Sequence, residues 1–330
     1  MLSSKENYMR TMRGEQPEYI PQSGEAVVLQ RPSILYGGRL NGAGIDIFGV
    51  EWVTEGSAIA MPIPKCSDFI LQDITKWRDV IKFPDFSGVD WETMAKKDKS
   101  KVDPSKPYGA GCAAQGFFQS VMAFMGFSEG LLAIAEEPEE VSELINYLCD
   151  CYLGLSDNLL KYYEPDFIHF ADDIATEINP FISIKSFREI FAPVWRRYIS
   201  FFKDRGYIAQ MHNCGRIEDF LDDIVDMGFN AWDPAQVIND LVGIKAKFGN
   251  KLVICGGFNP RDYLPHIDIS EDQCRANVRK TLDELAVGGG YIFAGVGGPA
   301  SPDDELTLQR AGWINDEFEK VRYGFYEPTH

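Results

Sequence analysis

The clearest candidate for chemistry in this sequence is a histidine and a cysteine two residues apart. His212 and Cys214 stand in the segment Met-His-Asn-Cys-Gly at 211–215, between an expected strand and an expected helix. In an extended chain, side chains at positions i and i+2 point the same way, so the imidazole and the thiolate can converge on one ion. Zinc accepts this pair of nitrogen and sulfur ligands. The alternative is a packed cysteine beside a hydrogen-bonded histidine.

Two further residues at expected strand ends could complete such a site. Cys255 ends the expected strand Leu252–Cys255 and is either a third ligand or a small buried apolar residue. Asp233 follows the expected strand Phe229–Trp232 and could supply an oxygen ligand or orient the ring of His212.

Adjacent carboxylates close another expected strand, Asp166–Asp172. Asp172 and Asp173 could transfer protons or hold a cation, and one of them could instead cap the following helix. His169 lies within the apolar part of the same strand, so we expect it to be a hydrogen-bonded core histidine.

Strand and helix patterns alternate along the C-terminal half of the chain, with a last expected strand at Tyr291–Val296. Apolar residues recur at helical spacing over 141–159, Ser270 and Gln273 predict a capping box at a helix start, and 301–304 predicts another helix start. Such alternation indicates parallel strands joined by right-handed crossovers, in either an open sheet or a closed eight-stranded barrel. No Gly-x-Gly-x-x-Gly follows a strand, which removes the usual support for a dinucleotide-binding sheet. The pattern therefore favours the barrel, in which the carboxyl ends of the strands form the active face.

Composition restricts the classes of partner. The 330 residues include 32 basic and 50 acidic ones, a net charge of −18. Such a surface repels nucleic acid and anionic lipid. The sequence contains no run of about 18 apolar residues, so it predicts no membrane-spanning helix. The first residues lack the apolar stretch of a signal peptide, and the seven cysteines form no disulfide framework. We expect a reduced, cytoplasmic enzyme.

Domain organisation follows from two further observations. The first 110 residues are rich in glycine, proline and aromatic residues and show little helical periodicity, which indicates an irregular N-terminal extension. No low-complexity linker interrupts the chain, so residues 1–330 are expected to form a single domain.

Several motifs, in order, resemble the uroporphyrinogen decarboxylase superfamily. They are the opening 10–21, the segment 46–52, the helix start at 137–141, the Asp172-Asp173 pair, the His212-x-Cys214 motif and Gly-Gly-Phe-Asn-Pro at 256–260. The resemblance covers nearly the whole chain and implies a single (β/α)8 TIM barrel with its cleft at the carboxyl ends of the strands.

The resemblance also favours one branch of that superfamily. True decarboxylases carry an Arg-Gln-Ala-Gly-Arg segment that grips porphyrinogen carboxylates, whereas only Arg31 and Arg39 lie in that region here. The other branch comprises zinc-dependent methyltransferases that exchange methyl groups with a corrinoid protein or coenzyme M. Their signature is His-x-Cys followed by a cysteine at a later strand end, but 293–299 contains none. This departure is more typical of a demethylase acting on a methoxylated or methylated small molecule.

The resemblance thus implies a corrinoid-dependent methyltransferase with one zinc per chain. His212 and Cys214 would bind the metal with Cys255 or Asp233, Asp172 or Asp173 would act as the acid, and a cobalamin-binding protein would be the partner. The candidate substrate contacts are Tyr36, Arg39 and Trp232, although most aromatic side chains simply pack a core. The alternatives are a carboxy-lyase acting on a smaller substrate and a ligand-binding barrel without turnover.

Overall fold

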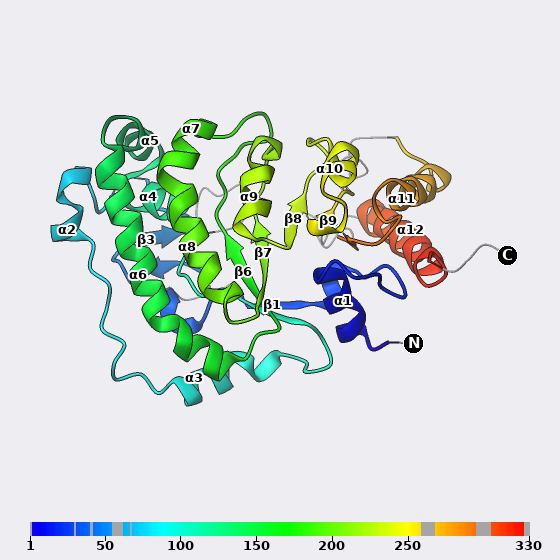
Figure 1. The fold of residues 1–330 in the computed structure, drawn as a ribbon, viewed down its shortest axis with the longest axis horizontal. Helices are drawn as coiled ribbons and strands as arrows, with labels where there is room; N and C mark the ends of the chain where they lie inside the picture. Colours follow the sequence, from blue (N-terminus) through cyan, green and yellow to red (C-terminus); the bar gives the residue numbers. More distant parts are fainter. Residues whose placement is uncertain are drawn as a thin grey trace.

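The computed structural model describes residues 2–29, 31–39, 42–54, 62–66, 68–258, 268–294 and 305–326. The helix start expected at 301–304 and the end of the strand expected at 291–296 lie outside these ranges. Seven parallel strands form the central sheet, in the order β1-β5-β6-β7-β8-β9-β10 (Figure 1). The strands are β1 (Val27–Leu29), β5 (Tyr108–Ala110), β6 (Phe167–Ala171), β7 (Ile208–His212), β8 (Ala231–Ala235), β9 (Val253–Gly256) and β10 (Tyr291–Phe293).

The sheet curls so that its two edge strands approach each other. Gln22 forms a parallel bridge with Phe293 of β10, and the backbone N–H of Phe293 donates to the carbonyl of Pro21 at 2.9 Å. The segment just before β1 therefore lies against β10, although β1 itself pairs with β5. The described residues thus form a seven-stranded, curled parallel sheet, consistent with a barrel, rather than the eight strands that the sequence predicts.

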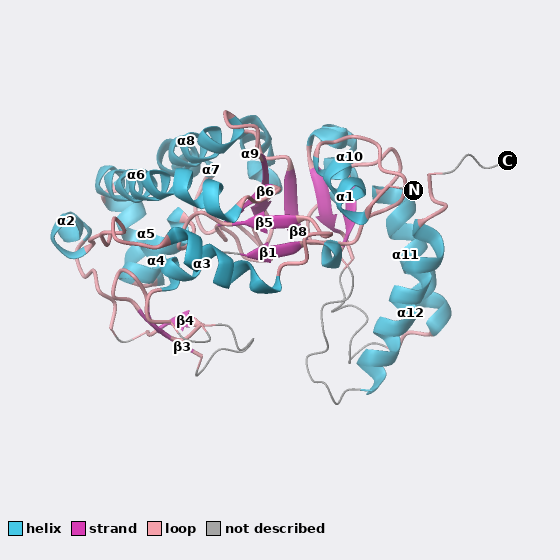
Figure 2. Ribbon diagram, turned by 90° about the horizontal axis from the view of Figure 1, so that it is seen from below, coloured by secondary structure: helices cyan, strands magenta, loops and turns pink. Residues whose placement is uncertain are grey.

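Helices cover the outer face of this sheet (Figures 1 and 2). Those that follow β5 are α4 (Phe117–Met125), α5 (Phe127–Glu136), α6 (Pro138–Tyr163), α7 (Ile184–Ser186), α8 (Ala192–Lys203), α9 (Leu221–Met227), α10 (Leu241–Phe248), α11 (Glu271–Leu285) and α12 (Glu305–Arg322). The sequence explains several boundaries. Pro138 opens α6 at a position that needs no N–H donor. Both bonds of the predicted Ser270–Gln273 capping box form at the start of α11.

The inner face of the sheet is apolar at one end and polar at the other. Tyr8, Met9 and Met12 of α1 (Ser4–Met12) pack against Phe167, Ala231, Val253, Cys255 and Ile292 of the strands. Because side chains alternate along a strand, His169, Gln210, His212 and Asp233 share this inner face nearer the carboxyl ends. The helix α1 therefore covers the end of the barrel interior opposite to the candidate site.

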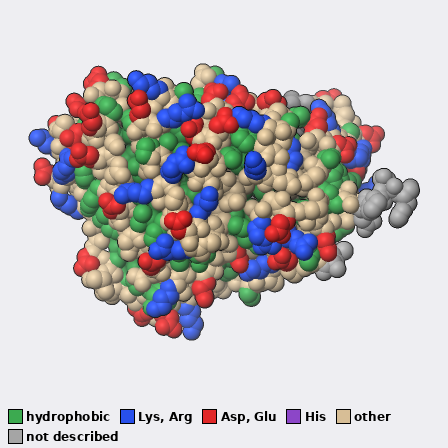
Figure 3. Space-filling model, in the orientation of Figure 1, with side chains coloured by type: hydrophobic (Ala, Val, Ile, Leu, Met, Phe, Trp, Pro, Cys, Tyr) green, Lys and Arg blue, Asp and Glu red, His purple; other side chains and the backbone are tan. Residues whose placement is uncertain are grey.

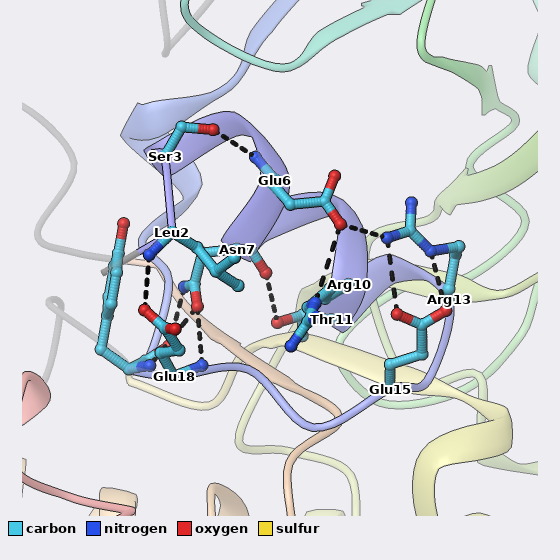
Figure 4. Close-up of polar contacts among 10 residues, drawn as sticks. Leu2, Ser3, Glu6, Asn7, Arg10, Thr11, Arg13, Glu15 and Glu18 are labelled. Atoms are coloured by element: carbon cyan, nitrogen blue, oxygen red, sulfur yellow. Dashed lines mark hydrogen bonds and ion pairs between the residues drawn. The ribbon is translucent and has the colours of Figure 1, made fainter.

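Hydrogen bonds cap α1 and join it to the segment that follows it (Figure 4). The Ser3 hydroxyl caps the helix by accepting from the N–H of Glu6 at 3.2 Å. Asn7, which is fully buried, donates to the carbonyl of Tyr19 at 2.9 Å and accepts from the N–H of Glu18 at 2.8 Å.

The N-terminal extension contains a small antiparallel sheet, β2 (Gly44–Ile45), β3 (Glu51–Val53) and β4 (Ile63–Pro64), together with α2 (Trp77–Val80) and α3 (Trp91–Asp98). Asp46 stabilises its turn, since it accepts from the N–H groups of Phe48 and Val50 and from the indole of Trp52. Figure 2 shows β3 and β4 set apart from the central sheet.

Within the described ranges no single helix is long and apolar enough to span a membrane. The helices α4 and α5 reach that length only as a pair bent by 116°, and most of α4 is buried. Acidic and basic side chains are interspersed on the face shown in Figure 3, so the excess negative charge forms no single patch there.

Candidate active site

The carboxyl ends of β6 and β7 bring three donor atoms of different chemistry together. One carboxylate oxygen of Asp173, one ring nitrogen of His212 and the sulfur of Cys214 all lie within 4.8 Å of one another. Nε2 of His212 is 3.9 Å from Sγ of Cys214. The i, i+2 spacing of the His-x-Cys motif therefore places both side chains on one side of the strand end, as the sequence predicts.

Hydrogen bonds between side chains and the backbone hold these two strand ends together. Asn213 is fully buried and donates to the carbonyl of Asp172 at 2.7 Å. The N–H of Cys214 donates to Oδ1 of Asp173 at 2.7 Å. Gly215 follows with φ +91°, and a Cβ there would lie only 2.5 Å from the carbonyl oxygen of Thr176. Glycine is therefore required where the chain leaves the site.

Asp233 orients the ring of His212. Its Oδ2 lies 2.9 Å from Nδ1 of His212, and its Oδ1 accepts from the amide of Gln210 at 2.8 Å. Burial lowers the pKa of His212, but hydrogen bonds to Asp233 and Cys214 outweigh it and raise the pKa to about 11. With Nδ1 engaged by a carboxylate, Nε2 is the nitrogen that faces Cys214.

The residues fit a zinc ion. A tetrahedral zinc with bonds of about 2.1 Å to nitrogen and 2.3 Å to sulfur separates those two ligand atoms by about 3.6 Å, close to the 3.9 Å between His212 and Cys214. Asp173 supplies a third donor of a type that zinc accepts. A carboxylate holding the second nitrogen of a histidine is the usual support for a zinc ligand.

His169 differs from the expectation of a hydrogen-bonded core histidine. It is buried, but its Nδ1 has no hydrogen-bond partner among the described residues. Its Nε2 lies 3.8 Å from Oδ1 of Asp233, so His169, His212 and Asp233 form a second group of closely spaced donors. Burial dominates over the nearby carboxylate and lowers the pKa of His169 to about 4.

The two adjacent aspartates have different surroundings. Asp172 is fully buried and accepts from the N–H groups of Phe118 and Gln119, both at 2.9 Å, so it caps the start of α4. This contact requires Gly116, where a Cβ would lie 2.2 Å from the carboxyl carbon of Asp172. Burial raises the pKa of Asp172 to about 7, although these two hydrogen bonds act to lower it. The sequence analysis allowed one of the pair to cap the following helix, but Asp172 caps α4, which precedes it in the chain. Asp173 faces the cleft.

These positions predict opposite effects for the two aspartates. Asp172→Ala should lower the free energy of unfolding by about 2 kcal/mol, because two buried N–H groups lose their acceptor. Asp173→Ala should lower the stability less, because the N–H of Cys214 that it leaves without this acceptor is only half-buried, and it should weaken metal binding. Urea unfolding and elemental analysis of both variants test this, and a stable Asp172→Ala protein would contradict the capping role.

A cleft of about 950 Å³ opens beside the three donors, with Asp173 and Cys214 in its wall. Its aromatic lining consists of Tyr36, Trp52, Phe69, Phe118, Phe127 and Phe181, and its polar lining includes Arg31, Arg39, Gln115 and Gln119. The predicted substrate contacts Tyr36 and Arg39 therefore lie at the cleft.

Trp232 does not lie at the cleft. Its side chain is fully buried in the outer core, and its indole donates to the carbonyl of Asn213 at 3.0 Å. The reason is strand alternation, since Asp233 points to the inner face and its neighbour Trp232 must point to the helices.

Two arginines, Arg31 and Arg39, line the cleft. Arg31 lies over the ring of Tyr36 and Arg39 over that of Trp52, with distances of 5.1 and 3.9 Å to the ring centroids. Neither forms an ion pair within the described ranges. Burial lowers the pKa of both guanidinium groups. The pKa of Arg39 falls to about 10, mainly through burial and secondly through the positive charge of Arg31. The cleft is therefore locally cationic on a chain of net negative charge.

Cys255 lies in the barrel interior, away from the three donors. It is 3% exposed, packs with the apolar side chains around α1 and belongs to neither group of closely spaced donors. Burial, and then the charge of Asp233, raise the pKa of its thiol well above the usual range. Of the two alternatives in the sequence, the structure places Cys255 among apolar residues.

Gln119 is a site residue that the sequence analysis missed. It lines the cleft, and its amide lies 3.4 Å from Oδ2 of Asp173. It stands on α4, whose start is fixed by Asp172 from a distant strand, so no local spacing could have identified it.

A comparison with protein families shows the family of this chain. The profile described as uroporphyrinogen decarboxylase (URO-D) matches residues 99–299, which is more than half of the sequence. The chain belongs to the uroporphyrinogen decarboxylase family. The resemblance inferred from the motifs is thereby confirmed.

A comparison with solved structures supports the fold. A methyltransferase from Methanosarcina mazei superposes with a TM-score of 0.67 over 97% of this chain and 99% of its own, at 15% sequence identity. A B12-independent methionine synthase from Shewanella sp. W3-18-1 has a TM-score of 0.44, with 10% identity over 73% of this chain and 69% of its own, which is too low to carry an argument. No curated protein sequence matches the chain.

Proposed function

We propose that this member of the uroporphyrinogen decarboxylase family is a corrinoid-dependent methyltransferase. It would transfer a methyl group between a small methylated compound, in the favoured case a methoxyaromatic one, and a cobalamin-binding protein. The observation that carries the proposal is the group of oxygen, nitrogen and sulfur donors from Asp173, His212 and Cys214 at the wall of an aromatic cleft. The shared fold with a methanogen methyltransferase supports it.

The ligand set we propose for one zinc per chain is Asp173, His212 and Cys214. Three protein ligands leave the fourth position for a substrate oxygen, as in catalytic zinc sites. Asp173 then takes the place that the sequence analysis assigned to Cys255 or Asp233, and Asp233 holds the imidazole. When bound, zinc would act as a Lewis acid on the oxygen that loses the methyl group.

The chain's own residues position the reactants. During demethylation the bond between the methyl carbon and oxygen breaks, cobalt(I) supplies the electron pair of the new carbon–cobalt bond, and the oxygen leaves with a negative charge. Gln119 holds the carboxylate of Asp173 through its amide. Tyr36 and Arg39 lie where they can contact an aromatic, electron-rich substrate in the cleft. A cleft of about 950 Å³ offers room for a small substrate, and the partner protein would dock at its mouth.

We also infer that the chain forms one closed barrel domain over residues 1–330. The bridge between Gln22 and Phe293 supports closure of the sheet, and the superposition over 97% of the chain supports a single domain.

One observation favours a second function, a carboxy-lyase acting on a smaller substrate. Arg31 and Arg39 have no acidic partners in the part of the chain that the structure describes, and unpaired guanidinium groups suit a carboxylate. The two proposals differ in product, since one releases carbon dioxide and the other methylates cobalt.

The proposed function is tested with the zinc-loaded protein, reduced cob(I)alamin and a panel of methoxyarenes and methylamines. Formation of methylcobalamin, followed by visible absorption, is the expected result for at least one methoxyarene. The cobalamin-binding protein encoded nearest to this chain's gene should replace free cob(I)alamin and raise the rate. Carbon dioxide release from small carboxylates without cobalt methylation would support the carboxy-lyase instead.

A further inference from the structure

His212 lies on a strand whose inner face changes from apolar to polar two residues before it. Along β7, Ile208, Gln210 and His212 point inward, because side chains alternate along a strand. Ile208 packs against the apolar cluster around α1, whereas Gln210 is buried with 4% of its surface exposed. Gln210 is therefore the first polar side chain on this face of the strand, and it directly precedes His212 there.

The hydrogen bond of the Gln210 side chain ends on Asp233. Its Nε2 donates to Oδ1 of Asp233 at 2.8 Å, and its Oε1 has no partner among the described residues. The amide cannot be reversed without loss, since its oxygen would then face a carboxylate oxygen. His169 lies farther away, with its Nε2 3.8 Å from the same Oδ1, which is too long for a hydrogen bond. Of these two side chains, Gln210 is the one that holds this oxygen.

The carboxylate of Asp233 joins two side chains of the neighbouring strand. Asp233 on β8 lies beside His212 on β7, and Gln210 stands two residues earlier on that strand. Oδ2 of Asp233 lies 2.9 Å from Nδ1 of His212, while Oδ1 accepts from Gln210. Because both oxygens are engaged, rotation of the carboxylate would break one of the two contacts. Gln210 thus fixes the plane in which Oδ2 meets the imidazole.

An amide holds the carboxylate without cancelling its charge. A lysine or arginine at position 210 would form an ion pair with Asp233 and compete with His212 for it. The neutral amide leaves the negative charge directed at Nδ1 of His212, where it fixes the ring and makes Nε2 a stronger metal ligand. Nε2 is the nitrogen that lies 3.9 Å from the sulfur of Cys214.

We propose that Gln210 is a positioning residue of the metal site, which acts on His212 through the carboxylate of Asp233. The proposal rests on the zinc site of the proposed function, but zinc affinity measures it without methyl transfer. The spacing Gln-x-His-x-Cys at 210–214 then carries a support and two ligands along one strand, with Asp233 of the next strand between the support and the first ligand.

The zinc affinity of Gln210→Met, measured by competition with a chromophoric chelator, tests the proposal. Methionine is apolar and similar in length, so the variant loses the donor and keeps most of the volume. Loss of an outer partner of a histidine ligand costs about 10- to 100-fold in metal affinity, and Gln210 acts one step farther out, so we expect a loss of about fivefold to tenfold. Wild-type zinc affinity in this variant would overturn the proposal.

A double-mutant cycle with Asp233→Ala separates positioning from packing. If Gln210 acts through Asp233, Gln210→Met should change zinc affinity less than about twofold once that carboxylate is absent. The same loss in both backgrounds would overturn the proposal. Thermal melting identifies a variant that fails to fold, and a crystal structure of the zinc-loaded wild type then decides. A distance above about 3.5 Å between Nε2 of Gln210 and Oδ1 of Asp233 would overturn the proposal there.

Gln115→Met is the matched control. Gln115 is also buried, with 8% of its surface exposed, and its Nε2 has no hydrogen-bond partner among the described residues, so this variant should keep the wild-type zinc affinity. An equal loss in Gln115→Met would count against a specific role of Gln210. Unchanged zinc affinity in Gln210→Met, with methyl transfer by the wild type, would contradict this proposal alone. The expected loss of affinity, without methyl transfer to cobalamin by the wild type from any compound of the panel, would contradict the proposed function alone.

Discussion

The Cys214→Ser variant is expected to lose most of its bound zinc and, with it, methyl transfer. The thiolate is the only sulfur among the three clustered donors, and serine cannot replace it as a soft anionic ligand. Loss of an outer partner alone costs about 10- to 100-fold in metal affinity, so loss of a ligand should cost more than about 100-fold. Competition with a chromophoric zinc chelator measures the affinity.

Cys255→Ser is the matched control for this variant. Cys255 is packed among apolar side chains, so the substitution should lower stability somewhat and leave one zinc per chain. Cys214→Ser should keep its stability and lose its zinc, since that side chain contributes little to the core. Loss of zinc in the Cys255 variant at full folding would show that this thiol is a ligand after all.

Asp233→Asn is expected to weaken zinc binding by about 10- to 100-fold without removing a ligand. The substitution keeps the size of the side chain but removes the negative charge of the carboxylate. That carboxylate lies against Nδ1 of His212 and accepts a hydrogen bond from Gln210. Bound zinc should then exchange faster, while the melting temperature changes little.

The same substitution at Asp226 controls for the change of charge. Asp226 is an exposed residue paired with Arg196 on the outer surface, so Asp226→Asn should bind zinc like the wild type. An Asp233→Asn protein with unchanged zinc affinity would contradict the positioning role of this carboxylate.

Local sequence patterns were sufficient to predict much of the fold. The apolar stripe of 141–159, the capping box at Ser270 and the short apolar runs of β6, β7 and β9 each depend on neighbouring residues, and each forms as expected. The start of β8 falls later than expected, at Ala231 rather than Phe229. The bridge between Gln22 and Phe293 could not be predicted, because it joins residues 271 positions apart.

The candidate site was predictable only in part, for the same reason. The i, i+2 relation between His212 and Cys214 is local, and the two side chains do lie close together. The difference between Asp172 and Asp173 depends on α4, which precedes them by more than 50 residues and provides the N–H groups that Asp172 caps. The choice between Cys255 and Asp173 as the third donor depends on how the strands are arranged around the barrel.

X-ray absorption at the zinc edge of the purified, zinc-loaded protein tests the central claim most directly. The account predicts one zinc per chain with a single sulfur neighbour at about 2.3 Å and lighter nitrogen or oxygen neighbours at about 2.0–2.2 Å. Cys214→Ser should remove the sulfur signal, and Cys255→Ser should leave it intact. Two sulfur neighbours in the wild type, or a protein that transfers methyl groups while free of zinc, would contradict the proposed site of Asp173, His212 and Cys214.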